Sequence, residues 1–279
     1  MQLETPAHQN SSARSIWLIS QFELTRLFLT KRGMILLAAF AIVWFFILKV
    51  LILESVEMLN DPNTLNIASS FLGQLNLNYL LQWPYSELAA YWLIAIFIFP
   101  YITILMTSDQ TASDAKRGTI RFLLLRTSRN ELLFGRFIGQ FIITVSLISL
   151  TIIPTLIMGM IREPNNALAT VPQLISVYGN LILLCSPFIA FMALLNSAYQ
   201  SSKISMLLAI ILVPLISSII GGLSNYLSIL EFLLYAIPGV QLTDTVQLTN
   251  FKLSSIIIPL FQTVAYLTLA QFVLARKSL

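Results

Sequence analysis

The chain has 279 residues, of which 57% are hydrophobic and 10% charged, and its mean hydropathy is +0.83. Soluble domains carry about 25% charged residues, so this composition excludes an ordinary soluble fold and predicts an all-α membrane protein. The formal net charge is +4, but the cations flank apolar runs as membrane orientation requires, so no nucleic acid partner is predicted.

Residues 1–32 are predicted to form a cytoplasmic tail followed by an amphipathic helix at the membrane interface. On a helix, Glu23, Arg26 and Thr30 share one face. A helix of this kind lies at headgroup depth; the alternative is a plain extension of the first span. The polar lead is too long for a cleavable signal peptide. The apolar face would consist of Trp17, Leu18, Phe22, Leu24 and Phe28.

Residues 33–279 are predicted to form one transmembrane domain with six helical spans. A span takes about 20 residues, and six apolar runs are long enough. The stretch 225–246 is too apolar for an ordinary external loop and is broken by Pro238-Gly239, so we expect a short re-entrant or interfacial hairpin before the last span. The expected spans are about 33–53, 88–107, 137–161, 174–196, 204–223 and 254–274.

The distribution of lysine and arginine predicts the orientation of the spans. One side of the predicted membrane collects most of these residues, whereas the other has Arg162, Lys252 and most of the acids. The positive-inside rule then places both termini in the cytoplasm, in agreement with an even number of spans. We therefore expect a multi-pass protein of the cell membrane, the cytoplasmic or inner membrane.

The segment between the second and third spans, Ser108 to Gly139, holds six of the cations. Gly118 permits a break in the chain, and Thr119 can cap a short helix. Ser128 and Glu131 form an S-x-x-E capping box at the start of the next helix. We predict two helical legs with a short coupling helix lying across their cytoplasmic ends.

Physical chemistry leaves two interpretations of this loop. It can contact a cytoplasmic partner, or it can lie on anionic lipid headgroups. Near the end of the loop, Gly135 and Gly139 form a small-xxx-small pair that permits close helix approach, within the subunit or across a dimer.

The loop also carries the pattern D-x4-D-x3-G-T-I, then L-L-L, then S-R-x-E-L-L-x-G-R, between Asp109 and Arg136. This pattern resembles the signature loop of permease subunits of type-2 ABC exporters. Phe22-Glu23-Leu24 resembles the connecting helix of the same family. Two positions depart from it, because family members often have proline near Thr127 and lysine near Arg136.

The resemblance implies an exporter permease that works with a separate ABC ATPase. Two ATPase copies and a second permease copy, in a homodimer, are expected, with ATP and Mg in the ATPase and no cofactor bound to this chain. The chain has no Gly-Lys dipeptide and hence no P-loop of its own. The expected coupling interface comprises Glu23, Arg26, Asp109, Asp114, Arg117, Gly118, Thr119, Ile120, Arg121, Leu124 and Arg129.

Lys49 and Glu231 are candidates for substrate contact or gating, since ionisable residues within apolar runs are costly. Lys49 can instead snorkel to the outer interface, and Glu231 can pair with Lys49 or Lys252. The only histidine is His8, and no catalytic or metal-binding motif occurs, so we expect no enzyme. The alternatives are a membrane assembly or maturation factor that works with an ATPase, and a stand-alone secondary transporter. The weakly charged spans favour a lipophilic or amphipathic cargo over a small ion.

Overall fold

The computed structural model of the chain describes residues 11–52, 83–108, 125–199, 201–224, 231–240 and 253–276. Throughout these residues the chain forms helices and the turns between them, without a strand. Six of the helical stretches are long and apolar enough to cross a membrane. The all-α class and the six candidate spans predicted from hydropathy are therefore confirmed.

The first two helices, α1 (Ser11–Phe28) and α2 (Lys31–Phe46), are separated by a sharp corner. The N-cap residue Thr30 is extended, and its Oγ1 accepts a hydrogen bond from the Gly33 amide at 3.1 Å. A Cβ at Gly33 would lie 2.1 Å from the Leu27 carbonyl oxygen, so only glycine fits the corner. The amphipathic segment is thus a separate helix and does not extend the first span.

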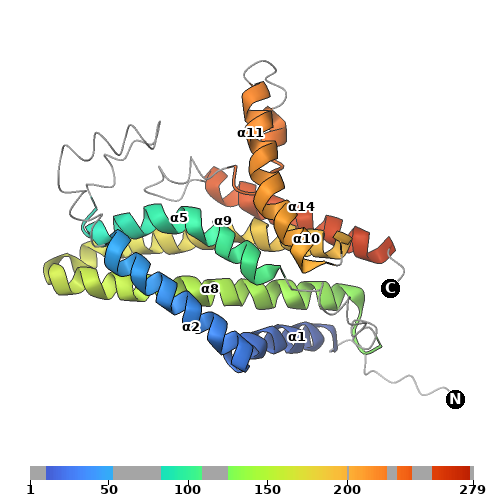
Figure 1. Cartoon of the computed structure of the whole chain (residues 1–279), viewed down its shortest axis with the longest axis horizontal. Coiled ribbons are helices and arrows are strands. Elements are labelled where there is room, and N and C mark those ends of the chain that lie inside the picture. The colour runs from blue at the N-terminus through green and yellow to red at the C-terminus, as the bar shows by residue number, and fades with distance from the viewer. Residues whose placement is uncertain are drawn as a thin grey trace.

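The centre of the bundle is made by three helices that contact one another: α5 (Ser86–Thr107), α8 (Arg129–Arg162) and α9 (Ala167–Tyr199). They run along one common direction in Figure 1. A single 3₁₀ turn, η3 (Pro164–Asn166), joins α8 to α9. Within an apolar window of 18 residues in the stretch Pro164–Tyr199, 67% of the residues are buried, the highest share among the candidate spans. We call α5, α8 and α9 the central helices.

Hydrogen bonds between side chains join α8 to both of the other central helices. The Tyr91 hydroxyl of α5 lies 3.0 Å from the Thr151 hydroxyl of α8, and the Ser149 hydroxyl of α8 lies 2.9 Å from the Tyr178 hydroxyl of α9. Around this turn of α8 the buried side chains Leu147, Ile148 and Ile152 belong to the hydrophobic core. Burial of such side chains and polar pairing between helices hold membrane bundles together. The large buried side chains of α5 are Tyr91, Trp92, Ile96 and Phe99.

The other spans lie at the periphery. The first span ends in a π-helical stretch, η1 (Ile47–Ile52), and the fifth consists of α10 (Ser202–Leu207), the π-helical η4 (Leu208–Leu212) and α11 (Val213–Ser224). Only 12% of an apolar window of 18 residues in Ser202–Ser224 is buried, and α11 projects away from the central helices in Figure 1. The short α12 (Glu231–Leu234) precedes α14 (Leu253–Arg276), which packs on α9.

The helix α8 defines two ends of the molecule. Its 34 residues correspond to about 51 Å, well beyond the hydrocarbon core of about 30 Å. It begins at what we call the basic end, where α5 also stops and where Arg129 and Arg136 lie. It finishes at what we call the far end, at Arg162 and the turn into α9. At both ends α8 is therefore long enough to leave the lipid.

Candidate functional site

The predicted coupling site lies at the basic end, where the connection 109–124 leaves α5 and enters α8. The connection itself, and with it the predicted coupling helix, falls outside the described residues. Its two attachment points, Ser108 and Leu125, are described. The candidate residues that fall outside the described part are Asp109, Asp114, Arg117, Gly118, Thr119, Ile120, Arg121 and Leu124.

The first turn of α8 is closed by the capping box predicted from the sequence. The Ser128 hydroxyl accepts from the Glu131 amide at 3.2 Å, and a Glu131 carboxylate oxygen accepts from the Ser128 amide at 2.9 Å. Each bond satisfies an amide that the helix itself leaves unpaired. This prediction is confirmed, and it sets where the connection ends and the rigid helix begins.

Arg129, one of the predicted interface residues, reaches sideways to the last turn of α14. Its Nη1 donates to the Leu274 carbonyl oxygen at 2.7 Å and to the Ala275 carbonyl oxygen at 3.1 Å. A cation at a helix C-terminus is favoured by the helix dipole and satisfies carbonyls that lack helical partners. The start of α8 is thereby attached to the end of the last span.

The last turn of α5 is attached to α9 in a similar way. The Asn196 side-chain amide of α9 donates to the Thr107 carbonyl oxygen at 3.1 Å, and both residues are buried. Thr107 is the last residue of α5, so its carbonyl has no partner within that helix. Both ends of the connection therefore leave from helices that are fixed to their neighbours.

The helix α1 packs lengthwise against the start of α8 through two glycines. A Cβ at Gly135 would lie 2.8 Å from the Ile19 Cβ, and a Cβ at Gly139 would lie 2.9 Å from the Glu23 Cβ. The Ser20 hydroxyl donates to the Gly135 carbonyl oxygen at 2.8 Å. The small-xxx-small pair therefore serves a contact within the subunit, one of the two possibilities that the sequence left open.

This contact encloses a charged side chain. Glu23 is only 3% exposed, and its Oε2 accepts a hydrogen bond from Gln140 Nε2 at 3.2 Å. The guanidinium of Arg136 lies one turn before Gln140 on the same face of α8 and is also buried. The buried face of α1 thus contains its only acid, hydrogen-bonded to the Gln140 amide of α8.

The opposite face of α1 is apolar and exposed. Trp17 is 51% exposed and Phe22 62% exposed, and Leu18 lies between them. The sequence interpretation placed Leu24 on this face as well, and that assignment is wrong, because Leu24 packs against the hydrophobic core. An exposed apolar face over a buried acid is the arrangement expected of a helix that lies between protein and lipid.

The two predicted gating candidates lie apart from the basic end. Lys49 is exposed on η1, on the same span as the exposed Phe45 and Phe46, at the position expected for a snorkelling lysine. Glu231 begins α12. Its suggested partner Lys252 is not among the described residues.

Arg26, another predicted interface residue, is half-buried and lies one turn beyond Glu23 on α1.

Beyond α12 the chain forms a turn, buried at residues 237–239, whose backbone carbonyls are bound by side chains of α14. Gln262 Nε2 donates to the Tyr235 carbonyl oxygen at 2.8 Å and to the Ile237 carbonyl oxygen at 3.1 Å. The Tyr266 hydroxyl donates to the carbonyl oxygen between them, that of Ala236. Gly239 completes the turn with a φ of 90°, which favours glycine. The carbonyls of an irregular segment are thus satisfied beside the middle of an apolar helix.

Sequence reasoning did not assign Ser20, Arg136 and Gln140 to the site. The sequence held part of the evidence for Arg136 and Gln140. Gly135 and Gly139 mark one face of α8, and each glycine is followed directly by one of these two residues. Within the part of the chain that the structure describes, no group of three or more His, Cys, Asp or Glu side chains is placed to hold a metal ion.

Comparison with known proteins adds one finding. The family model described as ABC-2 family transporter protein matches residues 17–279, nearly the whole chain from α1 onward. No curated protein matches the chain.

Proposed function

Because the chain belongs to the ABC-2 family of transporter proteins, as its transmembrane component, we propose that it is the permease subunit of an ATP-driven exporter and that its basic end binds a separate ATPase. The chain has no Gly-Lys dipeptide, so ATP and Mg²⁺ would bind to the partner. This chain would then supply the membrane path and the mechanical attachment.

The attachment of both ends of the connection 109–124 is the observation that carries this proposal. Thr107 is held by Asn196 of α9, and Arg129 is held by the end of α14. A partner that moves the connection would therefore move helices, since the connection is flanked by Thr107 at the end of α5 and by Arg129 at the start of α8. This is what mechanical coupling requires, whereas a loop that served only as a topology signal would not need fixed attachment points.

The buried Glu23 suggests a division of labour within the predicted interface. A carboxylate that is 3% exposed cannot serve as a surface contact for an ATPase. We assign to Glu23 the role of fixing α1 to α8, so that α1 follows any movement of α8. Arg26 and the cations of the connection, Arg117 and Arg121 among them, remain the candidates for direct contact with the partner.

A second copy of the chain is part of the proposal. No described residue of α11 is buried, and nothing lies within 4 Å of a Cβ built at Gly221 or Gly222. A span with an open glycine face allows close approach of another helix. By the same family analogy, two permeases and two ATPases form the transporter.

We propose that the protein lies in the cytoplasmic or inner membrane and that its basic end faces the cytoplasm. Arg126 and Lys203 are exposed at this end, with α1 along its side. The exposed apolar face of α1 would rest on membrane lipid, and the cargo, by the low charge of the spans, would be lipophilic. Binding of ATP would drive transport because the ATPase binds one arrangement of the helices more tightly than the other.

Co-purification with the ATPase encoded beside this chain tests the proposal. We expect the ATPase to co-purify with the wild-type chain but not with the double variant Arg117→Glu/Arg121→Glu. Lys203→Glu is the matched control, because it reverses an exposed cation at the same end but outside the connection. Retention of the ATPase by the double variant, or its equal loss in the control, would contradict the proposed interface.

A further inference from the structure

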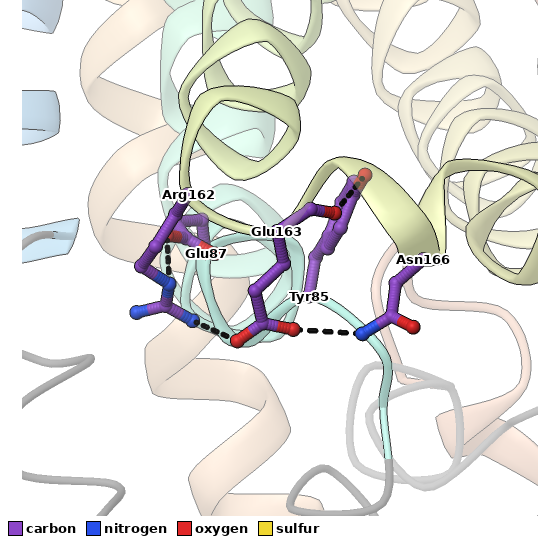
Figure 2. Close-up of polar contacts among 5 residues, drawn as sticks. All are labelled: Tyr85, Glu87, Arg162, Glu163 and Asn166. Carbon is purple, nitrogen blue, oxygen red and sulfur yellow. Dashed lines mark hydrogen bonds and ion pairs between the residues drawn. The ribbon is translucent and has the colours of Figure 1, made fainter.

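A polar cluster lies at the far end of the molecule, where α5 begins and α8 turns into α9 (Figure 2). It joins residues from the start of α5, the end of α8 and the turn η3, which leads into α9. None of them belongs to the predicted coupling site. The members are Tyr85, Glu87, Arg162, Glu163 and Asn166.

The carboxylate of Glu87 is buried but only half satisfied. The residue is 2% exposed, and its Oε1 pairs with Arg162 Nε at 3.1 Å. Its Oε2 is buried and makes no hydrogen bond within the described residues. A buried polar atom without a partner costs free energy and needs an explanation. An ion pair that served only to hold helices together would be expected to satisfy both oxygens.

Arg162, in contrast, has a second carboxylate close by, that of Glu163. Its side chain is 38% exposed, and its Nη2 also lies 3.6 Å from Oε1 of Glu163. The Glu163 carboxylate is itself positioned by Asn166, whose Nδ2 donates to Oε2 at 2.7 Å. The guanidinium is therefore shared between a buried carboxylate and an exposed one, and it can leave the first for the second and water with a small side-chain movement.

Tyr85 makes the closed arrangement of this end specific. Its hydroxyl donates to the Glu163 carbonyl oxygen at 3.1 Å, and its ring lies against Gly159, where a Cβ would be 2.7 Å from a ring carbon. The start of α5 is thus seated on the last turns of α8. Separation of α5 from α8 at this end would have to break both this contact and the Glu87–Arg162 pair.

The helix α8, which contains Pro154, connects this cluster to the basic end as a single helix. It runs from Arg129, beside the connection 109–124, to Arg162 within the cluster. A displacement or rotation at its start is carried along one continuous helix to the guanidinium at its end. A movement of α8 that starts at the basic end would therefore shift Arg162 relative to Glu87.

We propose that the Glu87–Arg162 pair is an exchangeable latch that keeps the far end of the central helices closed and that opens when Arg162 passes from Glu87 to Glu163. The proposal rests on the proposed transport function, because opening of the far end is the step that releases cargo. Glu87 and Arg162 act in it as positioning residues and make no contact with cargo.

The test measures exposure of α5 behind the latch. Ala90 lies one turn beyond Glu87, is 2% exposed, and can be replaced by cysteine in a chain whose own cysteine is removed by Cys185→Ala. The rate of labelling by a membrane-impermeant maleimide reports opening in membranes that contain the full chain. We expect Glu87→Gln and Arg162→Ala to raise this rate several-fold.

Glu163→Gln separates a latch from a simple structural pair. It removes the competing carboxylate but leaves the Glu87–Arg162 pair intact, so the latch predicts labelling slower than in the parent. A cluster in which every contact only stabilises the closed end predicts faster labelling for all three variants. Faster labelling in Glu163→Gln, or parental labelling in both Glu87→Gln and Arg162→Ala, would overturn the proposal. Because Glu163 is exposed, this variant also guards against misfolding as the cause.

The same readout keeps the latch separate from the proposed function. Labelling of the chain alone requires no ATPase, so loss of co-purification leaves the test of the latch intact. In a purified complex that hydrolyses ATP, we expect labelling of the parent to change with the nucleotide state. A complex that hydrolyses ATP and shows constant labelling would refute the latch while leaving the permease assignment in place.

Discussion

Glu23 of α1 sits directly on Gly139 of α8, so close that a Cβ on the glycine would lie 2.9 Å from the Glu23 Cβ. This close contact buries the Glu23 carboxylate, which accepts a hydrogen bond from Gln140, the next residue of α8. The side chains of Trp17, Leu18 and Phe22 remain exposed on the opposite face of α1. The relation makes α1 and the start of α8 one unit at the end where the ATPase is proposed to bind.

Replacement of Gly139 by alanine should separate this unit. The added methyl meets the Cβ of Glu23 rather than the far end of a flexible chain, and overpacking of this kind costs about 1–3 kcal/mol. Thermal unfolding in detergent, followed by circular dichroism, measures the effect. Gly221→Ala is the control, because a Cβ there has nothing within 4 Å and alanine favours a helix. Equal midpoints for Gly139→Ala and the wild type would contradict the packing.

Glu23→Ala should cost about 1–3 kcal/mol, since it leaves the buried Gln140 amide without this acceptor. The free energy of unfolding in mixed micelles gives the cost. The matched test is a double-mutant cycle with Gln140→Leu, in which the double variant should lose less than the sum of the single losses. Additive losses would mean that the two side chains are not coupled.

The seat of α1 shows what a sequence can and cannot predict. The six apolar runs and the Ser128–Glu131 capping box were predictable, because hydropathy and capping depend on residues close together in the chain. The face of α1 that packs against α8 could not be predicted from the sequence. An acid on an amphipathic helix is expected to face water, but here the partner helix offers a glycine groove and an amide, so Glu23 turns inward and Trp17 outward.

The far-end cluster escaped sequence analysis for a similar reason. In the sequence, Glu87 and Arg162 lie just outside two different predicted spans, 88–107 and 137–161, and are 75 positions apart. Only the antiparallel packing of α5 on α8 brings them to 3.1 Å. Pairings of this kind depend on the order in which helices pack, and one sequence carries no direct record of that order.

Arg129→Ala should loosen the last turn of α14, because the Leu274 and Ala275 carbonyls lose a charged donor. A favourable charge at a helix terminus contributes about 0.3–1 kcal/mol, so a roughly two- to five-fold rise in amide exchange is expected there. Hydrogen exchange read by mass spectrometry measures this rise. Arg126→Ala, three positions earlier and exposed, is the control and should leave α14 unchanged.

Gln262→Leu should release the turn that follows α12. The variant removes the donor for two carbonyls in an apolar setting, where unsatisfied backbone groups are costly. A cysteine at Ile237, which is buried in the parent, should then react several-fold faster with a thiol reagent. Gln271→Leu, on the same helix, is the control. Unchanged reactivity in Gln262→Leu would show that the turn is held by other contacts.

The central claim is that the basic end binds a separate ATPase, and site-specific photo-crosslinking tests it most directly. A photoreactive amino acid replaces Arg121 in the connection, and in a second variant replaces Asn165, which is exposed at the far end. After irradiation of intact membranes, mass spectrometry identifies the attached polypeptide. We predict an ATPase adduct from position 121 and none from position 165. No ATPase adduct at position 121, or equal adducts at both positions, would contradict the account.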